Sequence, residues 1–181
     1  MIRTVLISGA LTEERLGQVA GELRRLATDT SRTDNLVVII NSAAGNSAAA
    51  LRFIDDLSGS EHLKRLVELA EVKIYEAKSV ATLLAFAFGG TRELSVQGKI
   101  GFDLGERVVQ VGNPDHYEPE GRLAPQFMER WLAYRNAVLS LMHRLGLDAD
   151  PDIETRFCGA EYHLELPAPE CLRRGIINRI F

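Results

Sequence analysis

The chain has 181 residues, of which 46% are hydrophobic and 25% are charged, and its formal net charge is −4. This composition is typical of one globular domain with a substantial core. Lysine and arginine are scattered along the chain, so neither the charge nor its distribution indicates nucleic-acid binding.

Segments that would direct the chain to a membrane are not evident in the sequence. The apolar run near the N-terminus is too short for a signal peptide, and the longest apolar stretch, residues 80–88, is far too short to cross a bilayer. Cys158 and Cys171 have no metal-site spacing and cannot form a disulfide framework. We therefore expect a cytoplasmic protein without a metal ion or cofactor, and without membrane or nucleic-acid partners.

The first ninety residues alternate between predicted strands and helices. Apolar, β-branched runs predict buried strands at residues 4–7, 36–40 and 72–75. Helical periodicity predicts helices after them, and the first of these begins with Thr12 as its N-cap. The predicted helices cover residues 13–27, 48–57, 61–69 and 80–88. This alternation is typical of a parallel sheet with right-handed crossovers, in which ligands bind beyond the carboxyl ends of the strands.

Two turns are predicted at that edge of the sheet, at residues 42–47 and 76–79. Gly45 in the first turn has no Cβ, so either it lets its N–H approach a ligand carbonyl closely or it merely permits a tight turn. Ser79 in the second turn opens a helix that is apolar on nearly every side. Its hydroxyl is either the N-cap of that helix or a nucleophile placed beside free backbone N–H groups.

Beyond Gly90 the predicted elements are shorter, apart from one long helix. Two strands at 91–96 and 99–104, separated by a turn at Gly98, precede a third strand at 107–111 and a polar loop at 112–121. An amphipathic helix at 124–145 follows, with Gly146 as its C-cap. A short helix after Pro167 and a closing strand at 176–180 complete the chain.

The order and spacing of several segments resemble those of the Clp protease proteolytic subunit, within the ClpP/crotonase fold. The resemblance covers nearly the whole chain and rests on residues 3–7, 39–45, 77–81, the helix from 124, and 168–178. It implies an α/β fold in which β-β-α and βαβ units repeat as a spiral with a protruding helix. It also implies a single ClpP-like domain over residues 1–181, with a handle-like region at about 105–146.

The resemblance places Ser79 at the family's nucleophile and the backbone N–H groups of Gly45 and Val80 at its oxyanion hole. The catalytic histidine of the family is not matched, because Asp103 stands at its position. An ionised aspartate is a weak base for a serine hydroxyl. The family's aspartate should fall near residues 157–160, where Glu161 is at best a displaced substitute. The catalytic triad is therefore expected to be degenerate.

Other side chains remain open as alternative bases for Ser79. His62 and His143 are expected on solvated helix faces, whereas His116 and His163 remain as alternative bases that could reach the site. A Ser–Lys dyad, which is also known on this fold, would use Lys78 or Lys99.

The resemblance leads to two main functional hypotheses. In the first and preferred one, the protein is a catalytically impaired homologue that acts as a structural or peptide-binding subunit of a ring-like homo-oligomer. In the second, it is an active serine peptidase or acyl hydrolase with a non-standard base. A crotonase-like acyl-CoA enzyme is a weaker third hypothesis. Pairing with an unfoldase ATPase is not expected, because the first predicted strand begins close to residue 1.

Overall fold

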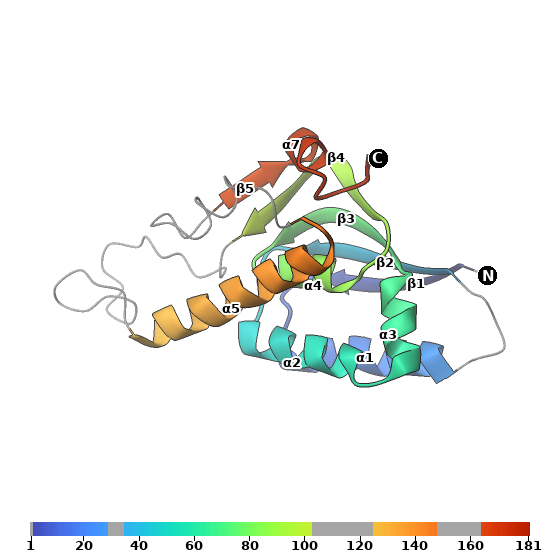
Figure 1. Cartoon of the computed structure of the whole chain (residues 1–181). Coiled ribbons are helices and arrows are strands. Elements are labelled where there is room, and N and C mark those ends of the chain that lie inside the picture. Colours follow the sequence, from blue (N-terminus) through green and yellow to red (C-terminus); the bar gives the residue numbers. More distant parts are fainter. Residues whose placement is uncertain (1, 29–34, 103–124, 148–163) are drawn as a thin grey trace.

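The computed structural model describes residues 2–28, 35–102, 125–147 and 164–181, and Figure 1 shows their arrangement. The strands are β1 (Ile2–Ser8), β2 (Asn35–Ser42), β3 (Glu71–Lys78), β4 (Arg92–Phe102), β5 (Leu164–Pro167) and β6 (Arg179–Ile180). The helices are α1 (Glu13–Thr28), α2 (Ser47–Ser58), α3 (Glu61–Glu68), α4 (Val80–Ala87), α5 (Pro125–Arg144) and α7 (Ala168–Arg173).

The strands form one sheet in the order β1-β2-β3-β4-β5, and β6 pairs with β4. Neighbouring strands from β1 to β4 are parallel, while β5 runs antiparallel to β4. The parallel pairing expected from the alternation of strands and helices is therefore confirmed. Because the crossover helices return the chain to the same edge each time, the ends of β2 and β3 lie side by side.

Helices α1, α2, α4 and α5 lie on one side of the sheet, and α5 extends at its first turns beyond the other helices (Figure 1). All eight residues of α4 are buried, as its apolar sequence predicts. Trp131 and Tyr134 of α5 are the largest fully buried side chains and pack against this region of the core. None of the helices in the described ranges is long and apolar enough to span a membrane.

The helix starts follow local sequence signals. Thr12 accepts a hydrogen bond from the backbone N–H of Arg15 at 3.2 Å, which confirms it as the N-cap of α1. Asn46 caps α2 in the same way, through a bond from the N–H of Ala49 at 2.9 Å. This cap fixes the direction in which the chain leaves the turn that contains Gly45.

The structure corrects three predicted boundaries. Strand β3 continues through residues 76–78, and a single residue, Ser79, separates it from α4. The predicted turn at Gly98 is instead a bulge within one continuous strand, because residues 95–98 lie between two consecutive pairings of β4 with β3. The closing strand contains only Arg179–Ile180. The predicted strand at 107–111, the polar loop at 112–121 and the start of the predicted helix at 124 lie outside the described residues.

Candidate active site

Ser79 has an unusual backbone conformation at the junction of β3 and α4. Its φ is 55° and its ψ is −124°, and it is the one non-glycine residue with positive φ in the described ranges. A side chain in this region of φ/ψ space costs about 1–3 kcal/mol and persists only where the surroundings hold it there. Such strain clusters at functional sites, so Ser79 is the natural centre of the candidate site.

Three elements hold the backbone of Ser79 in place. Its N–H donates to the carbonyl of Gly101 in β4 at 3.1 Å. Its carbonyl accepts the N–H of Thr82 in α4 at 3.0 Å and the hydroxyl of Tyr134 in α5 at 2.9 Å. Both polar groups of the serine backbone are therefore satisfied, each by a neighbour from a different element.

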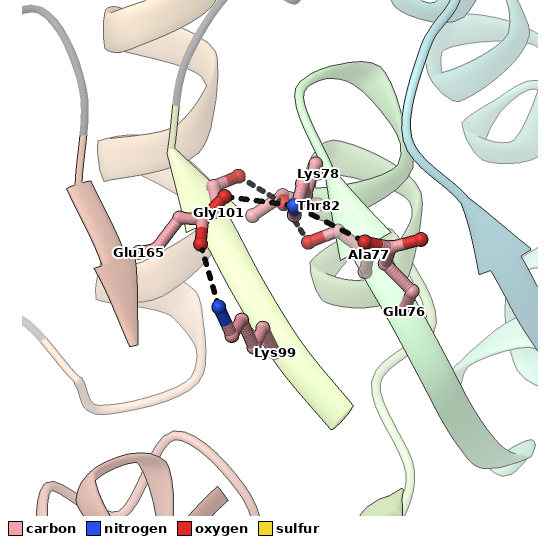
Figure 2. Close-up of polar contacts among 7 residues, drawn as sticks. All are labelled: Glu76, Ala77, Lys78, Thr82, Lys99, Gly101 and Glu165. Atoms are coloured by element: carbon pink, nitrogen blue, oxygen red, sulfur yellow. Dashed lines mark hydrogen bonds and ion pairs between the residues drawn. The ribbon is translucent and has the colours of Figure 1, made fainter. Parts of the chain in front are cut away.

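Thr82 adds a second connection between α4 and the two central strands. Its hydroxyl oxygen lies 2.9 Å from the carbonyl oxygen of Ala77 and 2.6 Å from that of Gly101 (Figure 2). These carbonyls belong to β3 and β4 on either side of the serine turn. The one polar side chain in an otherwise apolar helix thus fixes the start of α4 against the strand ends.

The side chain of Ser79 is not used for capping. It is fully buried, and its Oγ has no hydrogen-bond partner among the described residues. The N-cap interpretation of Ser79 is therefore wrong, since no helix N–H donates to its hydroxyl. An unsatisfied buried hydroxyl costs about 1–3 kcal/mol, which is difficult to explain as a purely structural feature.

Gly45 lies directly against the first residue of α4. A Cβ built on Gly45 would lie 2.7 Å from the Cβ of Leu11 and 3.2 Å from the Cβ of Val80. The close approach explains why glycine is needed here, because any side chain would overlap Leu11. The structure thus brings the two predicted turns together at the edge where β2 and β3 end.

Among the described residues, no backbone acceptor faces the N–H group of Gly45 or that of Val80 at this edge. Leu11 bonds to the peptides on either side of Gly45, through its N–H to Ala44 and its carbonyl from Asn46, each at 3.0 Å. In a parallel bridge of this kind the N–H of the central residue points away from its partner. The N–H of Val80 is in the first turn of α4, where it has no intrahelical acceptor.

Charged side chains next to Ser79 form a chain across β3, β4 and β5. Glu165 of β5 binds the ammonium group of Lys78 at 2.8 Å and that of Lys99 at 3.2 Å (Figure 2). Glu76 also contacts Lys78, at 3.1 Å. The hydrogen bond from Lys78 lowers the pKa of Glu165, and the same bond raises the pKa of Lys78. Lys78 is therefore held as a charged ammonium group, which cannot accept a proton from a hydroxyl.

The remaining candidate residues divide into two groups. His62 on α3 and His143 near the end of α5 are exposed, as predicted for solvated helix faces. The other candidates lie outside the described residues, namely Asp103, His116, Glu161 and His163. Within the described ranges, no group of three histidine, cysteine or acidic side chains is placed to hold a metal ion.

Sequence analysis did not identify Thr82, Tyr134 or Glu165 as part of the site. Thr82 carried a visible signal, as the one polar residue in a fully apolar helix. Tyr134 and Glu165 carried none, because their roles depend on which residues α5 and β5 meet in space.

Comparison with known proteins identifies the fold. No family model matches the chain, and no curated protein matches it either. Among solved structures, the chain is similar to the ClpP protease catalytic domain from Plasmodium falciparum, with a TM-score of 0.62 and 13% sequence identity. The match covers 99% of this chain and 84% of that chain. The chain therefore has a ClpP-like α/β fold, as the sequence resemblance implied.

Proposed function

We propose that this chain is a ClpP-like subunit that binds peptides at the Ser79 site and hydrolyses them far more slowly than a serine peptidase with a complete triad. The conformation of Ser79 is the observation that carries the proposal. Its strained backbone and its buried, unpartnered hydroxyl lie beside Gly45 and the start of α4. A hydroxyl with no other partner beside fixed backbone donors is one requirement for attack on a carbonyl group. The Ser79 side chain is fully buried, so a bound peptide must displace the residues that cover it.

Peptide binding at this site would depend on two backbone N–H donors. The N–H groups of Gly45 and Val80 would donate hydrogen bonds to the carbonyl oxygen of a bound peptide, and would stabilise the negative charge that develops there on attack. Donors of this kind are each worth about 10²–10³ in rate, because they are fixed before the reaction begins. The first turn of α4 adds the positive end of its dipole.

Slow hydrolysis is expected because no general base for Ser79 is identified among the described residues. Lys78 and Lys99 both form ion pairs with Glu165, and the bond to Glu165 raises the pKa of Lys78, which holds this residue in its charged form. Asp103, which stands where the family has its histidine, has a reference pKa far below that of a serine hydroxyl. Loss of a triad member typically costs several powers of ten in turnover, while the oxyanion donors and binding retain a residual rate.

An active serine hydrolase is the second candidate function. It is favoured by the strain at Ser79, since a protein that had lost its chemistry would gain stability by relaxing this residue. The base would then be Asp103, His116 or His163, with the proton of Ser79 Oγ passing to it as the hydroxyl oxygen attacks. Variants of these three residues would decide among them.

Labelling with a fluorophosphonate probe tests both candidates. We expect slow covalent labelling that maps to Ser79 by mass spectrometry and is abolished in Ser79→Ala. Turnover of short fluorogenic peptides should be about 10³-fold or more below that of a peptidase with a complete triad. The control is Ser58→Ala, because Ser58 is an exposed serine whose hydroxyl already donates to Ile54 at 3.2 Å.

The outcomes separate the two candidates. Fast peptide turnover that disappears with Ser79→Ala would replace the first candidate by the second, and the base would then be sought among the three residues named above. A folded protein that is not labelled at Ser79 under any condition would contradict both. Equal labelling of Ser58 would show that the probe reports exposure rather than activation.

A further inference from the structure

One hydrogen bond connects α5 to the strained serine. Tyr134 is fully buried, and its hydroxyl donates to the carbonyl oxygen of Ser79 at 2.9 Å, across 55 positions in the sequence. Trp131 packs beside it, with the two ring centroids 5.9 Å apart. The ring is thus held by packing, and its hydroxyl points at the backbone rather than at solvent.

The carbonyl that Tyr134 holds belongs to the same peptide unit as the N–H of Val80. A peptide unit is planar and trans, so its C=O and its N–H point in opposite directions. Fixing the direction of the Ser79 carbonyl therefore also fixes the direction of the Val80 N–H. Tyr134 in α5 thus sets the direction of the Val80 N–H in α4 without contacting that N–H.

The other backbone hydrogen bonds of Ser79 do not by themselves fix the direction of the Val80 N–H. The N–H of Thr82 also reaches the Ser79 carbonyl, but it belongs to the same first turn of α4 and moves with it. The bond from the Ser79 N–H to Gly101 lies on the preceding peptide unit, so it does not restrain ψ of Ser79 directly. In the part of the chain that the structure describes, Tyr134 is the one side chain from another element that donates to the Ser79 carbonyl.

We propose that Tyr134 is a positioning residue, whose hydroxyl holds the Ser79–Val80 peptide so that the Val80 N–H is aimed as an oxyanion donor. The role of the Val80 N–H as an oxyanion donor rests on the proposed function. The effect of Tyr134 on the orientation of the Ser79–Val80 peptide does not. Without the hydroxyl, the peptide can rotate toward the ordinary conformations that Ser79 avoids in the structure. The site would then lose one aimed donor while the fold stays intact.

The experiment uses Tyr134→Phe in the full chain, which keeps the buried ring and removes only the hydroxyl. Tyr75→Phe is the matched control, because Tyr75 is a half-exposed tyrosine of β3 whose ring contacts Phe181. We expect the first-order rate constant of fluorophosphonate labelling to fall about five- to tenfold in Tyr134→Phe, the factor that one neutral hydrogen bond supplies. The probe concentration for half-maximal rate should not change.

A merely structural role would give a different result. It would lower the fraction of folded protein, and so the final extent of labelling, without changing the rate constant of the folded fraction. Urea unfolding of both variants supplies that fraction. The Tyr75→Phe control should match the wild type in both quantities.

Hydrogen exchange gives a second measurement that does not depend on chemistry at Ser79. The amide of Thr82, which donates to the same Ser79 carbonyl, should exchange about five- to tenfold faster in Tyr134→Phe than in Tyr75→Phe, while amides in β1 and β2 keep their rates. Faster exchange with slower labelling supports the proposal. If exchange is faster in Tyr134→Phe but the wild-type protein is never labelled, Tyr134 does hold the Ser79–Val80 peptide. The proposed function is then refuted. Unchanged exchange, or labelling at the wild-type rate, overturns the proposal.

Discussion

At the scale of single residues, Ser79 combines two features that each lower the stability of the folded chain. Its backbone is in a strained region of φ/ψ space, and its buried hydroxyl has no partner among the described residues. A residue that lowers the stability of the folded chain in two ways is more readily explained by a role in function than by a role in stability.

The first prediction concerns the buried hydroxyl. Ser79→Ala should raise the free energy of unfolding by about 1 kcal/mol, because it removes an unsatisfied polar group without removing a hydrogen bond. Urea unfolding followed by circular dichroism measures the change. The control is Ser42→Ala, in which a buried hydroxyl loses its 2.6 Å bond to the Gly9 carbonyl and stability should fall by a similar amount. A loss of stability in Ser79→Ala would show that its hydroxyl has a partner after all.

The second prediction concerns the close approach at Gly45. In Gly45→Ala the new methyl group would lie 2.7 Å from the Cβ of Leu11, so the turn must move and stability should fall by about 1–3 kcal/mol. Labelling of Ser79 should fall by about 10²-fold, because one oxyanion donor is displaced.

Gly21→Ala is the matched control for this change. A Cβ at Gly21 of α1 would have no atom within 4 Å, so the substitution should stabilise the helix by about 0.5–1 kcal/mol. Labelling should then equal that of the wild type. Gly45→Ala protein with normal labelling would remove Gly45 from the site.

At the scale of elements, Glu165 ties the edge strand β5 to both central strands. It is the common partner of Lys78 in β3 and Lys99 in β4. The pKa of Glu165 is lowered from its ordinary value of 4.5, and the pKa of Lys78 is raised from 10.5. The contribution of the Lys78–Glu165 pair to stability is therefore complete between these two values, lost below the first as Glu165 takes up a proton, and lost above the second as Lys78 releases one.

The third prediction follows from this pH dependence. The stability difference between the wild type and Glu165→Gln should be largest near neutral pH and should shrink as the pH falls below the ordinary glutamate pKa of 4.5. Unfolding curves at several pH values measure it. Glu71→Gln is the control, because Glu71 contacts Lys73 at a longer distance, 3.4 Å, in the same sheet. A difference that does not vary with pH would mean that Glu165 acts through packing alone.

The elements also show which parts of the structure were predictable. Strands β1 and β2, helices α1 and α2, and the burial of α4 follow from local periodicity and caps, and these predictions are confirmed. Strand β4 was divided at Gly98, because glycine usually marks a turn. In the fold that glycine is needed for packing instead, since a Cβ there would lie 2.6 Å from both the Tyr75 carbonyl oxygen and a side-chain carbon of Leu94.

The candidate site was predictable only in part, for a related physical reason. Ser79 and Gly45 could be located, because each stands at the end of a recognisable strand. Their surroundings could not, since Tyr134 and Glu165 reach the site from elements far away in sequence. The strained φ of Ser79 had no local signal either, as serine at a helix start is far more often a cap.

At the scale of the whole molecule, α5 is the helix that extends beyond the others (Figure 1). Leu132 is a large apolar side chain of α5 that remains 39% exposed. We therefore expect a homo-oligomer that uses this helix, and Leu132→Glu should shift the mass measured by light scattering toward that of the single chain. Leu69→Glu is the control, because Leu69 follows α3 and is 73% exposed. Equal masses for the wild type and both variants would contradict this role of α5.

The C-terminal segment, residues 176–181, covers part of the outer side of β4. Phe181 bonds to both Leu94 and Val96 of β4, and Asn178 accepts the N–H of Arg92 at 2.8 Å. These bonds occupy the part of the outer side of β4 that β5 does not reach. A truncation or fused tag that pulls this segment away would leave a row of unpaired backbone groups beside the exposed Val96, which is a template for aggregation. Such proteins should precipitate on mild warming, even though Ser79 and its surroundings are untouched.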